Sequence, residues 1–281
     1  MFKIISSLAL IAAALPSAHG THGHLKAVSG DKRRKKGRNI VGFWHIGASN
    51  YGNEVSRDEF VKNQAHEILN SYMFKEGLQD LDYDLRLNYV TRVELKDETK
   101  DFLRNTGLIH ELPPTQFEMK DDEEYFEFPT LTEIHQFCQK PENIDAEVFY
   151  IHSKTRDDLR NEMEDYLLGK TCVECLSDES KMACGPNHII GFYWEHFSGN
   201  FWMSRCSHVA NLNFPFERRI LDEENEGHHP AVYAVPPYGR YFAEYWLLND
   251  GGERGYRTFD MKESLLKKDQ VCSNSHDFFI K

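Results

Sequence analysis

The segment "AEVFYIH", Ala146–His152, is the most strand-like stretch of this sequence. It joins branched and aromatic residues with no turn-forming residue between them, which is typical of a strand buried on both faces. A charged amphipathic helix is predicted soon after it, from Asp157 to Leu168. A strand followed closely by a helix is the unit from which parallel sheets are built.

The same alternation is predicted nearer the N-terminus. The segment "NIVGFWHI", Asn39–Ile46, is a predicted buried strand, and a helix is predicted from Ser56, where Ser-Arg-Asp-Glu forms a capping box. A second strand is predicted over Asp84–Val93, and a helical stretch over Leu95–Thr106. This order predicts an α/β fold with a mostly parallel, Rossmann-like sheet and helices on both faces.

Later segments are less regular. Glu111–Glu127, with two prolines and an acidic cluster, is predicted to be a loop. A second capping box, "TLTE" at Thr130–Glu133, predicts the start of a helix that reaches Cys138. Beyond Gly185 the pattern predicts one strand, "HIIGFYW", and a C-terminal part that is rich in loops.

The N-terminal residues have the pattern of a targeting sequence. Residues 1–20 hold one lysine, an apolar run and then small residues, which predicts a secretory signal peptide, with an uncleaved anchor as the alternative. Residues 21–38 are predicted to be a basic, disordered arm, and 39–281 a single domain. The expected location is therefore outside the cell or in the lumen of the secretory pathway.

The charge of the chain bears on its partners. The formal net charge is −12, and the body is more acidic still, because the basic residues concentrate in the arm. So acidic a body repels phosphate backbones, which argues against nucleic-acid binding. A small anionic ligand would need locally clustered cations.

The chain has an even number of cysteines, which in a secreted protein indicates disulfides. We expect a disulfide-rich insertion at residues 170–187. The motif "CVEC", with a cysteine and a histidine downstream, leaves a zinc knuckle as the alternative. The residues concerned are Cys138, Cys172, Cys175, Cys184, Cys206, Cys272 and His188.

The segment "WEHFSGNFWMSRCSHVANL", Trp194–Leu212, sets aromatic rings on both sides of a Ser-Gly-Asn turn. Flat apolar faces beside short hydrogen-bonding groups are suited to a polar, ring-shaped ligand. The alternative is a loop that its aromatic residues pin to the core.

Three blocks of the sequence resemble a group of uncharacterised glycosyltransferase-like proteins. They are "FYIHSKTRDDLRNEMEDYLL", "HFSGNFWMSRCSHVANL" and "YFAEYWLLND", in this order, within Ile40–Asn249. The chain departs from the group at Met203, where a second tryptophan is usual, and in the segment around "CVEC". The resemblance implies the type A fold of nucleotide-sugar glycosyltransferases, a nucleotide-sugar donor, and a glycan or protein acceptor.

Such enzymes mostly hold a divalent metal with an Asp-x-Asp motif after a strand. Here "DLDYD", Asp80–Asp84, precedes its strand, and His152 and Lys154 stand where the motif would be expected. We therefore expect metal-independent chemistry with no cofactor, and a divalent metal remains the alternative. With Arg160, these two residues are expected to bind the donor diphosphate. The alternatives are a solvated lysine and an ion pair between Arg160 and Glu164.

The remaining candidate residues come from the second and third blocks. Glu244, among aromatic residues, is the candidate general base, with an ion pair to Arg240 as the alternative. His196 is a base, a phosphate partner or a ring packed on Trp194. Substrate contacts are expected from Ser198, Gly199, Asn200 and Trp202, of which Trp202 fits the core equally well. Two other classes remain open: a secreted, non-catalytic carbohydrate-binding protein and a disulfide-braced structural protein.

Overall fold

The computed structural model describes the greater part of the chain from Gly37 onward. The residues described are 37–47, 56–77, 83–91, 94–112, 127–153, 157–189, 195–212, 241–249 and 266–274. The predicted signal peptide, nearly all of the basic arm, and Lys154, Trp194 and Arg240 lie outside these residues.

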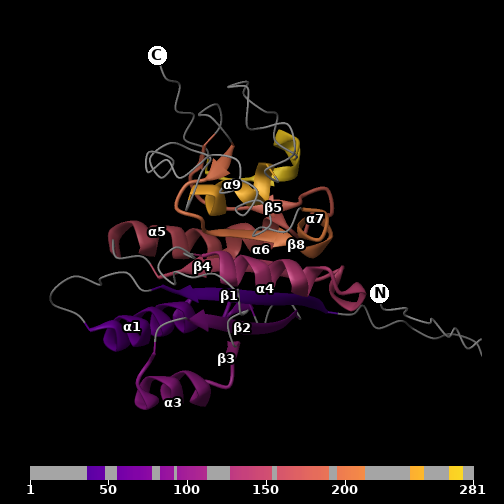
Figure 1. Cartoon of the computed structure of the whole chain (residues 1–281). Coiled ribbons are helices and arrows are strands. Elements are labelled where there is room, and N and C mark those ends of the chain that lie inside the picture. Colours follow the sequence, from indigo (N-terminus) through magenta and orange to yellow (C-terminus); the bar gives the residue numbers. More distant parts are fainter. Residues whose placement is uncertain are drawn as a thin grey trace, which may run out of the picture. The chain divides into compact units, whose positions relative to one another are not determined.

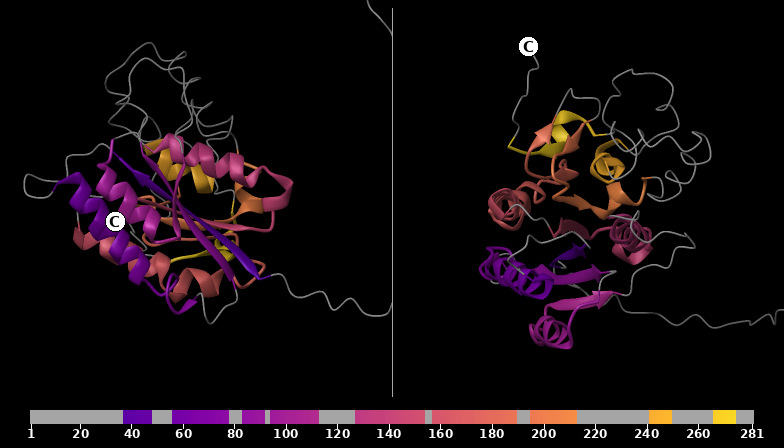
Figure 2. Two further views of the ribbon diagram at one scale, coloured as in Figure 1. Left: turned by 90° about the horizontal axis from the view of Figure 1, so that it is seen from below. Right: turned by 60° about the vertical axis from the view of Figure 1, so that its left-hand side comes forward.

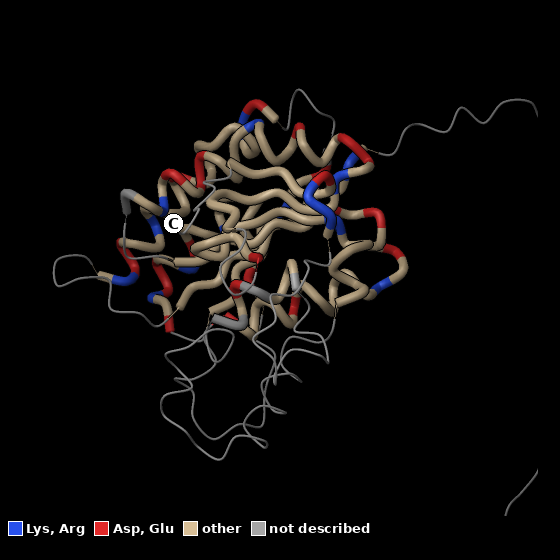
Figure 3. The backbone as a smooth tube through the Cα atoms, turned by 90° about the horizontal axis from the view of Figure 1, so that it is seen from above, with Lys and Arg blue, Asp and Glu red and all other residues tan. Residues whose placement is uncertain are grey.

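A seven-stranded sheet forms the centre of the fold, in the order β3-β2-β1-β4-β8-β5-β9 (Figure 1). Among the neighbouring strands only β8 runs antiparallel, to both β4 and β5, so the prediction of a mostly parallel sheet is confirmed. The strands are β1 (Arg38–Ile46), β2 (Tyr83–Thr91), β3 (Ile109–Leu112), β4 (Glu147–His152), β5 (Ala183–Cys184), β8 (Trp202–Arg205) and β9 (Val271–Cys272). Charged residues lie mainly on the surrounding elements rather than along the central strands (Figure 3).

Helices cover both faces of this sheet, as predicted (Figure 2). One face carries α1 (Arg57–Asn70), α3 (Asp97–Asn105), α5 (Asp157–Leu168) and α6 (Lys170–Cys175). The other carries α4 (Phe128–Cys138), α7 (Cys206–Val209) and α9 (Tyr241–Asn249). The smaller elements are a second sheet of β6 (His188–Ile189) and β7 (His196–Phe197), and the 3₁₀ helices η2 (Pro141–Asn143) and η4 (Lys268–Gln270).

Alternation along β4 decides which side chains meet which helices. Phe149 and Ile151 belong to the core under α1 and α5, whereas Val148 and Tyr150 belong to the core under α4 and α9. The two-residue period of a strand puts His152 on the same face as Tyr150. The rings of Tyr150 and His152 are indeed stacked, with their centroids 6.1 Å apart.

The first predicted capping box is confirmed in part, and the second is wrong. Ser56 caps α1, because its hydroxyl accepts from the Glu59 N–H at 3.3 Å. Helix α4 starts at Phe128, ahead of "TLTE", since Pro129 is suited to the first turn of a helix. Thr130 is therefore inside the helix, with its hydroxyl 2.8 Å from His45 Nδ1. The predicted loop Glu111–Glu127 also overlaps the end of β3.

Arg38 corrects the boundary of the basic arm. It is the first residue of β1, and its guanidinium is paired with the Glu147 carboxylate at the start of β4. It also donates to the Val173 carbonyl at 2.9 Å. A buried carboxylate needs such a partner, so Arg38 belongs to the folded domain.

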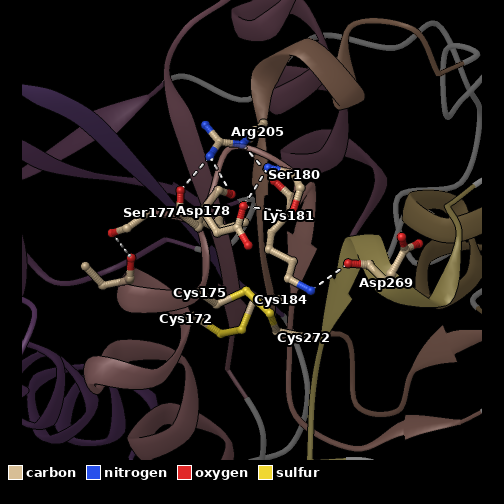
Figure 4. Close-up of a disulfide and its surroundings, with 12 residues drawn as sticks. Cys172, Cys175, Ser177, Asp178, Ser180, Lys181, Cys184, Arg205, Asp269 and Cys272 are labelled. Atoms are coloured by element: carbon tan, nitrogen blue, oxygen red, sulfur yellow. Dashed lines mark hydrogen bonds between the residues drawn. A yellow bond between two sulfur atoms is a disulfide. The ribbon is translucent and has the colours of Figure 1, made fainter.

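The prediction of disulfides is confirmed, and the zinc knuckle is wrong. All six cysteines pair, as Cys138–Cys206, Cys172–Cys184 and Cys175–Cys272. The two cysteines of "CVEC" thus join different partners (Figure 4). His188 Nε2 lies 2.6 Å from Glu195 Oε1 instead of near a cysteine cluster.

The segment 170–187 is part of the domain's framework. It supplies α6 and the sheet strand β5. Arg205 of β8 connects this segment to the sheet, because its guanidinium donates to the Lys181 carbonyl at 2.7 Å. The Lys181 ammonium group donates to the Asp269 carbonyl at 2.6 Å (Figure 4). Within the described part of the chain, no helix is both long and apolar enough to cross a membrane.

Candidate functional site

The order of the strands marks one edge of the sheet as a place for a ligand. The chain runs outward from β1 through β2 to β3, and then returns to the other side of β1 as β4. In sheets of this kind, ligands bind beyond the carboxyl ends of the strands where the order reverses. Here the two strand ends are tied together, because the Gly47 N–H donates to Ser153 Oγ and the Ser153 N–H to the His45 carbonyl, both at 2.9 Å.

His152, the last residue of β4, lies at this edge. Its Nε2 is 2.8 Å from the Gly199 carbonyl oxygen. A carbonyl only accepts hydrogen bonds, so Nε2 donates in this contact. Nδ1 lies 3.1 Å from a second carbonyl oxygen, that of Ser153. Nδ1 lies 3.8 Å from Glu127 Oε1. His152 therefore links the end of β4 to the Ser-Gly-Asn turn and to a carboxylate that precedes α4.

The Ser-Gly-Asn turn follows β7 and leads into β8. The Asn200 N–H donates to the Phe197 carbonyl at 3.0 Å, which closes a four-residue turn from Phe197 to Asn200. Gly199, the third residue of this turn, has a φ of 89°, which favours glycine there. Asn200 itself has a φ of 54°, a conformation that asparagine tolerates better than most residues. The Ser198 N–H donates to the Asn187 carbonyl at 3.0 Å.

Both ends of the Asn200 amide are engaged inside the protein, and the residue is 1% exposed. Its Oδ1 accepts from the Trp202 indole N–H at 2.9 Å, and its Nδ2 donates to the Glu127 carboxylate. We predicted Asn200 as a substrate contact; its geometry is that of a residue which holds Glu127. Trp202 is 1% exposed and packs in the core near Trp246.

Glu127 was missed in the sequence. It is the N-cap residue of α4, and a carboxylate is favourable at a helix N-terminus. The sequence offered one weak signal, an acidic cluster that ends where a helix begins, and we interpreted that cluster as a loop. The contacts with His152 and Asn200 are distant in sequence and only the fold reveals them.

Tyr150 connects Glu127 to Glu244, the predicted general base. Complete burial raises the pKa of the Tyr150 hydroxyl well above its ordinary value of 10, and the nearby Glu127 and Glu244 carboxylates raise it further. The hydroxyl therefore keeps its proton and lies within electrostatic reach of both carboxylates. Glu244, on α9, has its Oε2 4.0 Å from His196 Nε2.

These contacts, together with the electrostatic influence of Glu127 and Glu244 on Tyr150, relate six residues, which we call the β4-edge cluster. It contains five side chains that can exchange or donate protons and one amide that orients them. Its members are Glu127, Tyr150, His152, His196, Asn200 and Glu244.

Arg160 does not join this cluster. Its Nη2 lies 3.0 Å from Glu67 Oε2, its Nε lies 3.8 Å from Glu164 Oε1, and its guanidinium stacks over the Phe60 ring at 4.8 Å. The contact with Glu164 is the predicted alternative to donor binding, whereas the contact with Glu67 was not predicted; both partners belong to α5 and α1, on the opposite face of the sheet. Across the described ranges, no three His, Cys, Asp or Glu side chains gather as metal ligands.

Comparisons with known proteins identify a family. Residues 43–250 match the profile of a family described as "Domain of unknown function (DUF8361)". The chain belongs to this family. The DUF8361 region includes every member of the β4-edge cluster and excludes only β9 and the start of β1 among the sheet strands. No curated protein matches the chain significantly.

Among solved structures, the DUF8361 protein is similar to the mannosyltransferase Ktr4p from S. cerevisiae. The sequence identity is 11% and the TM-score is 0.33. The similarity covers 68% of this chain and 61% of the yeast enzyme, so the chain spans about three fifths of that enzyme's length. A likeness of this degree leaves the activity to be argued from the residues themselves.

Proposed function

We propose that this protein is a glycosyltransferase that moves a sugar from a nucleotide-sugar donor to a glycan or protein acceptor in the secretory pathway. The observation that carries the proposal is the β4-edge cluster. His152, the last residue of a strand where the strand order reverses, lies beside the Glu127 carboxylate, and the buried Tyr150 hydroxyl is within electrostatic reach of Glu127 and of Glu244, which is itself beside His196. This is where sheets of this type bind nucleotides, and it brings proton-transfer groups to such a ligand.

The chemistry needs a base for the acceptor hydroxyl and charge to balance the leaving diphosphate. Glu244 suits the first task, because its side chain is 28% exposed and a histidine lies beside it. Lys154 suits the second, since it follows the last residue of β4 by two positions in the sequence. An ammonium group there would strengthen its contact as negative charge builds on the diphosphate.

The three disulfides also support the proposal. They fit an oxidising compartment, which is where many proteins and glycans receive sugars.

The test uses the full secreted protein. UDP and GDP are titrated calorimetrically, and a panel of UDP-glucose, UDP-galactose, UDP-N-acetylglucosamine and GDP-mannose is assayed for donor hydrolysis. We expect one nucleotide to bind and its sugar conjugate to be cleaved. Binding of free glycans with no binding of either nucleotide would instead identify a carbohydrate-binding protein.

A further inference from the structure

The two carboxylates of the β4-edge cluster differ from the residues around them. The Glu127 and Glu244 side chains are 20% and 28% exposed, whereas Tyr150, Asn200 and Trp202 are almost completely buried. A ligand that reaches this group from solvent therefore meets the carboxylates first. The proposed function uses only one of them.

We propose that Glu127 is the carboxylate that attacks the donor sugar, in a double displacement in which Glu244 serves the acceptor. This inference rests on the proposed glycosyltransferase function. It assigns a second catalytic residue to the same site and fixes the stereochemical outcome.

The positions of the two carboxylates separate their roles. Glu127 lies beside His152 at the end of β4, next to the tied ends of β1 and β4 where the donor is expected. Glu244 reaches the cluster from α9 and lies beside His196 of β7. Both carboxylates raise the pKa of the buried Tyr150 hydroxyl, so both lie within electrostatic reach of it. They come from different elements, the N-terminus of α4 and helix α9.

Glu127 is held in one orientation by a short chain of hydrogen bonds. An indole N–H can only donate, so Trp202 Nε1 fixes Oδ1 as its partner on Asn200. The Asn200 NH₂ group must then face Glu127, where it donates to Oε2. A nucleophile fixed in this way needs little reorganisation before it attacks, which makes Trp202 and Asn200 positioning residues.

The reaction balances in two steps. A Glu127 carboxylate oxygen bonds to the anomeric carbon while the bond from that carbon to the diphosphate oxygen breaks, and the electron pair leaves with the nucleoside diphosphate. Glu244 then takes the proton of the acceptor hydroxyl, whose oxygen bonds to the anomeric carbon as the ester to Glu127 breaks. Two inversions give a product with the donor's anomeric configuration.

The experiment compares wild-type protein with Glu127→Gln and Glu127→Ala, using the donor that the panel selects. Glu142→Gln is the matched control, because Glu142 is exposed in η2 and outside the β4-edge cluster. We expect both Glu127 variants to lose transfer by about 10²-fold or more, with nucleotide affinity close to wild type. Glu127→Gln keeps an acceptor for the buried Asn200 amide and should also keep the wild-type melting temperature. Glu142→Gln should match wild type throughout.

Two readouts are specific to a nucleophile. With sodium azide, Glu127→Ala should form a glycosyl azide of inverted configuration, and wild type with a slow 2-fluoro donor should gain the mass of one sugar on the peptide that contains Glu127. An inverted product from wild type, or transfer by Glu127→Gln within a few-fold of wild type, overturns this inference and leaves the proposed function intact. Wild-type protein that binds no nucleotide and cleaves no donor overturns both.

Discussion

The Gln64 side-chain amide donates to Glu164 Oε1 at 2.6 Å beneath the sheet, on the face opposite to the β4-edge cluster. Gln64 also accepts from the Trp44 indole N–H at 3.1 Å, and its amide approaches the His152 carbonyl at 3.3 Å. Within the described part of the chain, Glu164 Oε2 has no hydrogen-bond partner. Burial raises the pKa of the Glu164 carboxyl from 4.5 to about 8, although Gln64 and Arg160 oppose the shift.

Glu164 should make the stability of the protein fall as the pH rises from about 5 to 8. In this range the folded protein keeps a proton on Glu164 that the unfolded chain releases, so the free energy of unfolding should fall by at most about 1.4 kcal/mol per pH unit. Glu164→Gln has no proton to lose and should remove this slope. Urea denaturation at pH 5.5 and 8 measures it, with Glu162→Gln, exposed on the same helix, as control. If the free energy of unfolding changes with pH equally in wild type and in Glu164→Gln, Glu164 is ionised at neutral pH.

Asn200→Asp should weaken transfer more at high pH than at low pH. Aspartate tolerates the left-handed backbone of Asn200 and still accepts from Trp202, but its second oxygen faces the Glu127 carboxylate. Two carboxylates at this distance repel unless they share a proton, which acid supplies. Transfer rates from pH 5.5 to 8 check this, with Asn211→Asp at an exposed position as control. A variant whose profile equals that of wild type would mean that Asn200 does not orient Glu127 in the reaction.

Lys154→Ala should reduce turnover by roughly 10² to 10³, because it removes a charge-assisted contact that strengthens as the diphosphate leaves. Lys154→Arg keeps the charge in a planar form and should retain part of the activity. Calorimetric titration with the nucleoside diphosphate that binds wild type measures the contact directly. Equal affinities for wild type and Lys154→Ala would remove this lysine from the site.

Transfer should persist in EDTA. The sequence places no Asp-x-Asp pair after β4, and the cations proposed there would balance the diphosphate charge instead. The measurement is the rate of donor hydrolysis before and after chelation, with added manganese as the comparison. Complete loss in EDTA that manganese reverses would show that a divalent metal, and not these cations, balances the charge of the leaving group.

Local patterns predicted the elements that depend on local contacts. The predicted bounds of α5 are those of the structure, and the predictions for β1 and β4 agree to within one residue, since their periodicity is set by burial within each segment. The short strands β5, β8 and β9 were missed. They exist because they pair with one another and with β4 across long stretches of sequence.

The candidate site shows the same division. The sequence placed His152 and Glu244 among the residues of interest from their neighbours along the chain. It could not reveal that Glu127 approaches His152 and Asn200, which lie 25 and 73 positions away. Arg160 shows the same limit, because its partner Glu67 lies on a different helix, 93 positions away in the sequence.

The pairing of β9 with β5 has a consequence for how the chain is made. Residues 183–184 are synthesised long before Val271 and Cys272, with which they pair in the sheet. Cys175 likewise cannot form its disulfide until Cys272 has been synthesised. Until then Cys175 lacks its native partner and lies in the same helix as Cys172, which pairs with Cys184. Cys272 is the last of the six cysteines to be synthesised, so any bond that Cys175 forms earlier has to be exchanged before the native pair can form.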